Sequence, residues 1–387
     1  MSINRRGMEF GRSIRLAGGV ALALGLSTAF GGSALAADLY YTSNTPATHP
    51  ENAITAKAMF EQIKEGTGGE HNVQISPGAV LAAAGEVLKS VGSGSLETGY
   101  VVYSYTPADL PVLNFLGSMY TQDNLVGGPA MTETILLNCE DCVAEQDAAN
   151  VRMLINATTD NYVFICANAG VETLADLQGK RVRGVGTMNP LIQGLGAAPV
   201  NIAYTEIYEA LQRGAADCTL LQQVELEGTQ LWEVAKHVTD APAGTFNAWS
   251  LLTVNKDFWQ GMSPEFKRVW LDASAGALAG TATQRRGAAE KIVEAAKSQH
   301  GVTFHEPSAE LVDAITKFRA EERGTLIAAA QSRGIANAEK IADTFQASVD
   351  KWQGIVDGIG PMPWNAEQEA QYLAAIKTEI YDKVPTE

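Results

Sequence analysis

Short apolar strands alternate with helices along this chain, and the alternation comes in two separate blocks. Strands that alternate with helices at such short spacing form βαβ units, which build a parallel sheet covered by helices on both faces. In the first block, strands are predicted at 39–42, 73–76 and 100–103, and helices at 49–65 and 81–91. We therefore expect an α/β lobe whose first part covers residues 37–160.

The same alternation returns in the middle of the chain. A compact helix is predicted at 205–213, with Thr205 as its N-cap and Gly214 directly after its last residue. The other predicted elements of this block are strands at 162–166, 181–184, 200–203 and 216–219 and a helical turn at 174–179. This block predicts a second lobe, residues 161–245.

The last part of the chain, residues 246–387, is predicted to return to the first lobe and then to become helical. A strand at 248–254 makes the return, and amphipathic helices follow at 264–300, 308–332 and 366–384. A chain of this length exceeds a typical single domain. Short crossings between two lobes, in place of one flexible linker, predict a hinge.

The first 36 residues have the pattern of a secretory signal peptide. Four arginines precede an apolar stretch at 16–30, and Ala34-Leu35-Ala36 offers a cleavage site with small residues. The apolar stretch is shorter than the ~20 residues that a membrane-spanning helix needs. We therefore expect cleavage after Ala36 and export to the periplasm, by the general or the twin-arginine route.

The charge of the chain restricts its partners. The full sequence carries a net charge of −16, and without residues 1–36 it has 24 basic and 43 acidic residues, a net charge of −19. Such a surface repels nucleic acid and anionic lipid, so no nucleic-acid partner is expected. An anionic ligand would have to be captured by local positive charge, which makes an arginine inside a cleft informative.

No cofactor, metal or catalytic motif is complete in this sequence. Gly184 and Gly186 begin a dinucleotide fingerprint, but Asn189 occupies the position of its last glycine. No nucleophile elbow is present, and the histidines lack the spacing of a helical zinc site, so they are expected to be solvated or packing residues: His49, His71, His237, His300 and His305. We expect a protein that is not an enzyme and holds no cofactor and no metal.

Two of the four cysteines lie close together in sequence. Cys139 and Cys142 form a C-x-x-C pair, which in an oxidising compartment favours a small disulfide. A redox motif or half a zinc site remains an alternative, but each needs a context that is not visible here.

Several motifs resemble, in order and spacing, those of the periplasmic binding subunits of tripartite ATP-independent periplasmic (TRAP) transporters. These subunits are the DctP-type, or family 7, extracellular solute-binding proteins. The matching segments are 174–183 (LADLQGKRVR), 195–200 (LGAAPV), 204–217 (YTEIYEALQRGAAD), 254–259 (VNKDFW) and 263–265 (SPE).

The resemblance implies a type II periplasmic binding-protein fold: two α/β lobes joined by a hinge, with long C-terminal helices. It also implies a function, the capture of a small organic anion, mainly a carboxylate, and its delivery to an ion-gradient-driven TRAP permease. We expect a monomer. A sensory receptor that presents its closed form to a signalling partner is the alternative. An exported hydrolase or lyase on the same frame lacks a recognisable nucleophile or metal set.

The resemblance places Arg183 at the cleft arginine of the family. A guanidinium can hold a carboxylate through two parallel charge-assisted hydrogen bonds, which lysine cannot reproduce. The alternative is an ion pair on the surface or between the lobes. Tyr204 falls at an aromatic position that can cover the carbon skeleton of a ligand, with core packing as its alternative.

Departures from the family pattern bear on the ligand. Many members have a second arginine where this chain has 162–164 (YVF). This departure favours a ligand with one anionic group, or a ligand bound more through hydroxyl and amide donors. Strand ends and the hinge supply the remaining candidate contacts, for which turn or packing roles are equally open: Thr187, Asn189, Ser43, Asn44, Tyr103, Ser104, Tyr105, Asn247 and Trp249. The implied fold also sets Cys166 beside Cys218, as a second disulfide or as two buried thiols, with the disulfide favoured.

Overall fold

The computed structural model describes residues 38–387 with the exception of residues 122 and 187. The predicted signal peptide, residues 1–36, therefore lies outside the described residues, and so does Thr187. None of the helices in the described part of the chain combines the length and the apolar character needed to cross a membrane.

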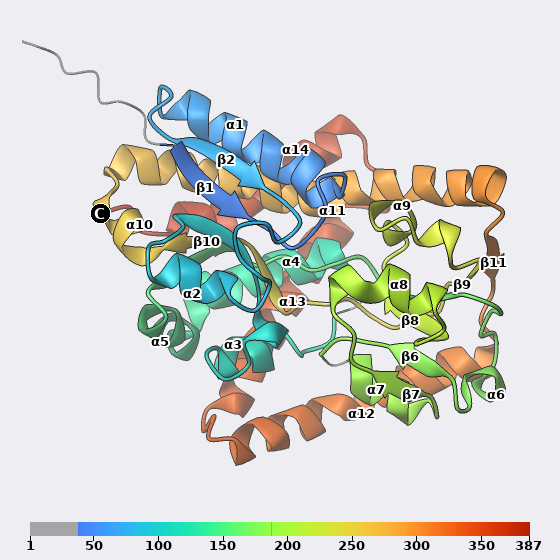
Figure 1. Ribbon diagram of the computed structural model, residues 1–387. Helices are drawn as coiled ribbons and strands as arrows, with labels where there is room; N and C mark the ends of the chain where they lie inside the picture. The colour runs from blue at the N-terminus through green and yellow to red at the C-terminus, as the bar shows by residue number, and fades with distance from the viewer. Residues whose placement is uncertain (1–37, 122, 187) are drawn as a thin grey trace, which may run out of the picture. The chain divides into compact units, whose positions relative to one another are not determined.

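Two separate β-sheets organise the described residues (Figure 1). The first has the strand order β2-β1-β3-β10-β4. Its strands are β1 (Asp38–Thr42), β2 (Asn72–Ser76), β3 (Thr98–Val102), β4 (Val151–Ile155) and β10 (Trp249–Asn255). Strands β1, β2 and β3 are parallel, whereas β10 runs antiparallel to both β3 and β4. The return strand predicted at 248–254 is thus part of the first sheet.

The second sheet has the order β11-β9-β5-β8-β6-β7. Its strands are β5 (Val163–Cys166), β6 (Arg181–Arg183), β7 (Ala198–Val200), β8 (Cys218–Leu221), β9 (His237–Thr239) and β11 (Thr303–His305). Here β6 is parallel to β7 and β8, but β5 is antiparallel to β8 and β9. Two lobes are confirmed. The expectation of a parallel sheet in each lobe was wrong, because β10 in the first sheet and β5 in the second run opposite to the strands beside them.

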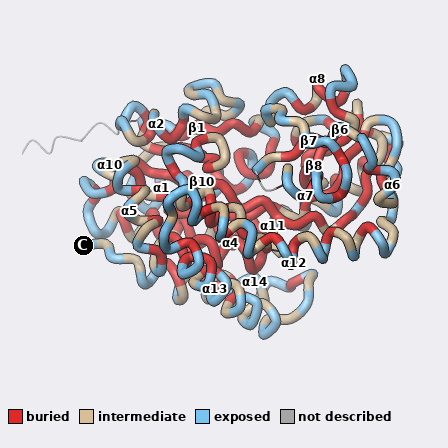
Figure 2. The backbone as a smooth tube through the Cα atoms, turned by 90° about the horizontal axis from the view of Figure 1, so that it is seen from below, coloured by how far each residue is buried: buried red, intermediate tan, exposed pale blue. Residues whose placement is uncertain are grey.

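Short helices surround the two sheets. The first lobe contains α1 (Lys57–Gly66), α2 (Val87–Gly92), α3 (Pro111–Leu116), α4 (Asn124–Glu133), α5 (Glu140–Ala148) and α10 (Lys256–Gly261), and the second contains α6 (Leu174–Leu177), α7 (Met188–Gly194), α8 (Ile207–Gln212) and α9 (Glu225–Gly228). The central strands β3, β5, β8 and β10 are buried along their whole length, whereas the edge strands β2 and β7 are partly exposed. Figure 2 shows buried residues running through the interior, with exposed residues on the outer turns and helices.

Long C-terminal helices connect the lobes, and their ends follow local sequence signals. Helix α11 (Pro264–His300) begins after the cap Ser263 and ends at Gly301, whose φ of +65° favours glycine. Ser308 likewise caps α12 (Ala309–Ser332). Helix α11 packs against α1 and α4 of the first lobe and against α9 of the second, and α12 contacts both α7 and α13 (Ala338–Ile359) (Figure 1). The last helix is α14 (Ala366–Glu379).

Two crossing segments, residues 156–162 and 240–248, also join the sheets and are bonded to each other. The backbone N–H of Thr159 donates to the carbonyl of Phe246 at 3.1 Å, and that of Tyr162 donates to Gly244 at 2.9 Å. Gly244 has a φ of +97°, a conformation that side chains disfavour. The predicted lobe boundaries, after residues 160 and 245, fall in these segments and stay predictions.

Several local predictions were wrong. The helix expected at 81–91 is confined to α2, and Thr205 does not cap α8, because a 3-10 turn over Tyr204–Glu206 precedes that helix. Tyr103 lies in a 3-10 turn after β3. Helices α4, α5 and α13 were not predicted. In α4 the pair Gly127-Gly128 and an internal Pro129 disfavour a helix, but every residue of α4 is buried, so tertiary packing overrides propensity.

Candidate ligand-binding site

Arg183 is the last residue of β6, and its side chain is only 2% exposed. Its Nε donates to the backbone carbonyl of Ile202 at 3.0 Å. Its Nη1 is buried and has no hydrogen-bond partner among the described residues. An unsatisfied buried donor on a charged group is costly, more so than an ordinary polar group. The bond to Ile202 therefore orients this guanidinium and leaves the N–H groups of Nη1 available to a ligand.

That side chain lines a small cavity of about 50 Å³, to which both lobes contribute. Strand ends of the first sheet and the turns after them provide one wall, and the ends of β6 and β8 with the following turns provide the other. The lining residues are Asn44, Thr45, His49, Glu51, Tyr100, Val102, Tyr105, Thr159, Tyr162, Arg183, Val185, Tyr204, Leu221, Gln222, Glu225 and Phe246. Carboxyl ends of strands are where open α/β sheets bind ligands.

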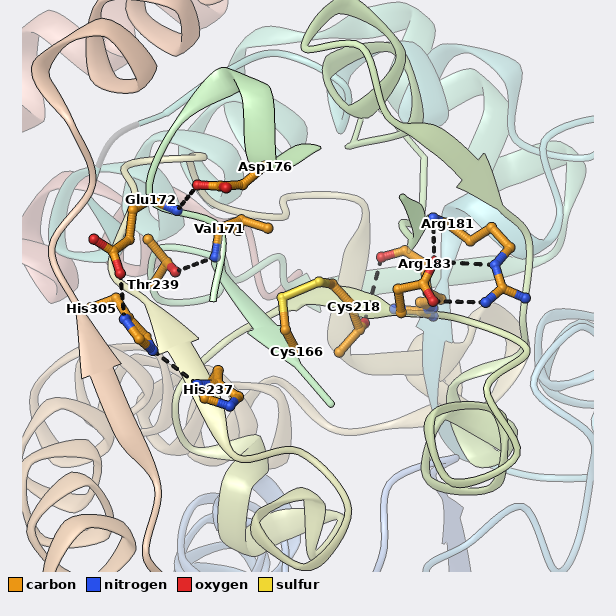
Figure 3. Close-up of a disulfide and its surroundings, with 12 residues drawn as sticks. Cys166, Val171, Glu172, Asp176, Arg181, Arg183, Cys218, His237, Thr239 and His305 are labelled. Atoms are coloured by element: carbon orange, nitrogen blue, oxygen red, sulfur yellow. Dashed lines mark hydrogen bonds and ion pairs between the residues drawn. A yellow bond between two sulfur atoms is a disulfide. The ribbon is translucent and has the colours of Figure 1, made fainter. Parts of the chain in front are cut away.

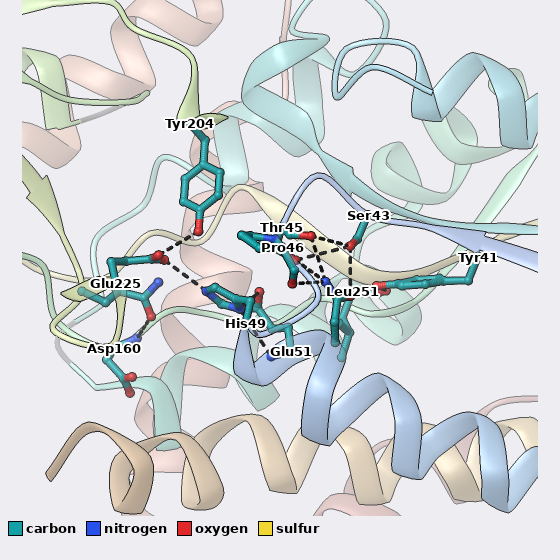
Figure 4. Close-up of polar contacts among 12 residues, drawn as sticks. Tyr41, Ser43, Thr45, Pro46, His49, Glu51, Asp160, Tyr204, Glu225 and Leu251 are labelled. Atoms are coloured by element: carbon teal, nitrogen blue, oxygen red, sulfur yellow. Dashed lines mark hydrogen bonds and ion pairs between the residues drawn. The ribbon is translucent and has the colours of Figure 1, made fainter. Parts of the chain in front are cut away.

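A buried ionic cluster, drawn in Figure 4, contributes to the lining of this cavity. His49 lies between two carboxylates, with Nδ1 at 3.0 Å from Glu51 Oε2 and Nε2 at 3.1 Å from Glu225 Oε1. The hydroxyl of Tyr204 donates to the other oxygen of Glu225 at 2.7 Å. Burial lowers the pKa of His49, but the charges of Glu51 and Glu225 outweigh burial and raise this pKa to about 10. The imidazole is therefore positively charged at neutral pH.

The cluster joins the two lobes. His49 follows the turn after β1, whereas Glu225 begins α9, shortly after β8. The turn is fixed by Asn52, whose Nδ2 donates to the carbonyl of Thr45 at 3.0 Å and whose Oδ1 accepts from Ser43 Oγ at 2.9 Å. Residues 176 positions apart therefore meet across the cavity through charged side chains.

A disulfide holds the strand next to Arg183. Cys166 of β5 and Cys218 of β8 are register partners and are bonded to each other (Figure 3). Strand β8 also pairs with β6, where Thr219 lies opposite Arg183. Cross-linking β5 to β8 therefore restricts the strand on which the guanidinium depends. Cys139 and Cys142 are also disulfide-bonded, at the start of α5.

The decisive comparison is with a protein family. Residues 41–321 match the sequence profile described as bacterial extracellular solute-binding protein, family 7. The chain belongs to this family. The match covers both sheets except the first residues of β1, and it includes every residue that lines the cavity. It identifies a TRAP solute-binding protein rather than an enzyme.

Known family 7 proteins resemble the chain along most of its length. The ectoine-binding periplasmic protein TeaA of Halomonas elongata is 23% identical over 291 residues, which are 72% of this chain and 80% of TeaA. The ectoine/5-hydroxyectoine-binding protein UehA of Ruegeria pomeroyi is 24% identical over 296 residues, 73% of this chain and 84% of UehA.

Solved structures show the same fold. A TRAP solute-binding protein of Rhodoferax ferrireducens, in complex with copurified benzoate, superimposes with a TM-score of 0.73 at 16% identity, over 82% of this chain and 99% of that protein. At this identity the likeness shows the fold alone. It supports the type II arrangement of two lobes with long C-terminal helices predicted for this family 7 protein.

Four of the predicted contact residues meet in the cavity: Arg183, Tyr204, Asn44 and Tyr105. Asn44 is 6% exposed, and its Oδ1 is buried without a partner in the described part of the chain. Asn189 is placed close by, since a Cβ built on Gly184 would lie 2.6 Å from Asn189 Oδ1, but Asn189 does not line the cavity. Ser104 lines a different cavity, on another side of Phe246.

The other predicted contact residues serve the frame of the family 7 fold. Ser43 holds the turn after β1. The hydroxyl of Tyr103 donates to Asn156, and Trp249 stacks on Tyr100 with ring centroids 5.1 Å apart. Asn247 donates to the carbonyl of Met119 at 2.6 Å and accepts from Thr245 at 2.8 Å, which ties the crossing segment to the loop before α4.

Sequence reasoning missed the acidic side of the cavity. The expectation that His49 is a solvated or packing residue was wrong, because it is buried between two carboxylates. Glu51 and Glu225 were lost among 44 acidic residues. The position of two residues in the sequence could have indicated this side of the cavity. Gln222 and Glu225 follow the end of β8, which lies next to β6, and ligand contacts in α/β folds often come after strand ends.

Proposed function

We propose that this family 7 protein captures a small organic acid in the cavity between its lobes, with the carboxylate of the ligand held by Arg183. After export and removal of residues 1–36, the protein would act in the periplasm. It would then deliver the acid to a TRAP permease driven by an ion gradient. The predicted signal peptide and the family to which the chain belongs support this location and this partner.

The observation that carries the proposal is the free donor of Arg183. A buried guanidinium is stable when its hydrogen-bonding groups are satisfied, and Nη1 lacks a partner in the residues described. A carboxylate would accept from it through a charge-assisted bond, which is stronger than a neutral one. The relatives support this chemistry, because ectoine and benzoate, which appear in their names, are both carboxylic acids.

Closure of the lobes would complete the site. The crossing segments 156–162 and 240–248 are the short connections about which the lobes could rotate, as in hinge closure around a ligand. His49 and Glu225 come from opposite lobes and bond directly. Opening the cavity would separate them, so ligand binding and this ion pair favour the same closed arrangement.

Binding to Arg183 can be tested by thermal unfolding in the presence of carboxylates. A panel of small carboxylates, hydroxy acids, keto acids and sulfonates should contain a compound that raises the Tm. At a concentration of ~100 times Kd, such a compound stabilises the protein by about 2.7 kcal/mol. The shift should disappear in Arg183→Ala and be strongly reduced in Arg183→Lys, because lysine lacks the planar fork.

Arg181→Ala is the matched control. Arg181 lies on the same strand, is largely exposed and pairs with Asp217 at 2.7 Å. Its loss should leave the ligand-induced shift intact. An unchanged affinity in Arg183→Ala would refute the assignment of the carboxylate site.

A further inference from the structure

The charges that line the cavity already balance without a ligand. Of the described lining residues, four carry charged side chains: Arg183, His49, Glu51 and Glu225. Both ring nitrogens of His49 face a carboxylate oxygen, at 3.0 and 3.1 Å, and a nitrogen is stable there only as an N–H donor. The imidazole therefore carries both protons and a positive charge. Two positive and two negative side chains give a net charge of zero.

The charged lining residues form two groups. Arg183 offers a donor that has no partner in the described chain. Glu51, His49 and Glu225 together carry a net charge of −1. Asn44 adds a buried acceptor oxygen without a described partner. The cavity can therefore donate a hydrogen bond to a ligand from Arg183 and accept one from a ligand at Asn44.

The charge of the ligand decides how well it fits this arrangement. A simple monoanion would satisfy Arg183 but would place a net charge of −1 in a buried cavity, inside a protein whose own net charge is −16. A ligand that also carries a positive N–H group keeps the balance at zero. The aromatic side chains of the wall add to this preference, because ring faces attract cations: Tyr100, Tyr105, Tyr162, Tyr204 and Phe246.

We propose that the ligand is a zwitterionic acid, with its carboxylate on Arg183 and an ammonium or amidinium N–H group facing Asn44 and the Glu51–His49–Glu225 cluster. This proposal rests on the proposed function and specifies its ligand class. Compounds of this class include small amino acids and cyclic amidinium carboxylates.

Isosteric pairs of compounds test the proposal on the unmodified protein. Ectoine and 3-methylcyclohexanecarboxylate share a six-membered ring with a methyl group and a carboxylate in the same relative positions, but only ectoine carries an amidinium group. L-Proline and cyclopentanecarboxylate form a second pair. Titration calorimetry should give at least one zwitterion an affinity on the order of 30-fold or more above that of its anionic partner, since a missing charge partner in a buried site is worth more than one decade in Kd.

A charge variant tests which residues read the positive group. Glu225→Gln keeps the shape of the side chain and should reduce the preference for the zwitterion by about tenfold while affecting the anionic partner less. Glu233→Gln is the matched control, because Glu233 is exposed and accepts from the hydroxyl of Tyr208, outside the cavity. The Glu233→Gln variant should prefer the zwitterion over its anionic partner as strongly as the unmodified protein does.

The outcomes separate this proposal from the proposed function. Tighter binding of the anionic partners, or of benzoate, would overturn the zwitterion proposal while capture of a carboxylate by Arg183 would stand. If no carboxylate of either class raises the Tm, both proposals fail. If a zwitterion binds but Glu225→Gln does not change the preference for the zwitterion over its anionic partner, the assignment of the ligand's positive group to this cluster is refuted.

Discussion

The two disulfides should contribute very differently to stability. Cys166 and Cys218 are 52 positions apart, whereas Cys139 and Cys142 are 3 apart. A cross-link destabilises the unfolded chain by restricting its conformations, and the effect grows with the logarithm of the loop length. For these loops the chain-entropy relation gives about 4 kcal/mol for the long one and about 1.6 kcal/mol for the short one. The expected difference is therefore about 2 to 3 kcal/mol.

Two double variants isolate this difference: Cys166→Ala with Cys218→Ala, and Cys139→Ala with Cys142→Ala. All four cysteines are buried, so the loss of sulfur packing is similar in both and largely cancels in the comparison. The free energy of unfolding would be measured by urea denaturation followed by circular dichroism. The first variant should be the less stable by about 2 to 3 kcal/mol.

A reduction control completes the experiment. Dithiothreitol should destabilise the unmodified protein and the variant that lacks Cys139 and Cys142, because both retain the bond between β5 and β8. It should destabilise the variant that lacks Cys166 and Cys218 much less. Equal stability of the two double variants, or a larger loss on removing the Cys139–Cys142 bond, would refute the reasoning. In that case native packing, and not the restriction of the unfolded chain, would dominate.

Two further predictions concern the cluster and the crossing segment. The pKa of His49 rises from 6.5 to about 10 on folding, so protonated His49 should stabilise the folded protein fully below pH 6.5. This stabilisation should be lost as pH rises towards 10, by up to about 1.4 kcal/mol per pH unit in urea unfolding. A His49→Gln variant with the same pH dependence would contradict this. Gly244→Ala should lower stability by about 1–3 kcal/mol, because φ is +97° and the new Cβ would lie 2.4 Å from Tyr120. Gly354→Ala, at an exposed position of α13, should instead raise stability by about 0.5–1 kcal/mol. Equal Tm shifts in the two glycine variants would show that neither the backbone angle nor the clash matters.

The sequence predicted the elements whose ends are set by local chemistry. Helix α11 was predicted with its observed ends, because a serine cap and a proline mark its start and a glycine in the left-handed region follows its end. The return strand was recognised as an apolar run between polar segments, and it does lie in the first sheet. These signals reside in the segment itself, so no knowledge of the rest of the fold is needed.

Elements defined by tertiary packing were not predictable in this way. Helix α4 carries two glycines and a proline yet is helical, because it is buried along its whole length against α11 and α13. The direction of β5 in its sheet is likewise decided by its neighbours β8 and β9, not by its own residues. Patterns within 162–166 indicate a strand but carry no information about its partners.

The same distinction explains which half of the cavity the sequence indicated. Arg183 stands out because an arginine at a strand end before glycine is unusual and falls in a family motif, so one position suffices to single it out. Glu51 and Glu225 are ordinary acidic residues until the fold places both beside His49, and only then do the three residues form a cluster with a net charge of −1. The sequence therefore indicated Arg183, the residue that we propose to hold the acid group of the ligand. The side chains that we propose to select the rest of the ligand act together only after the fold has brought the two lobes together.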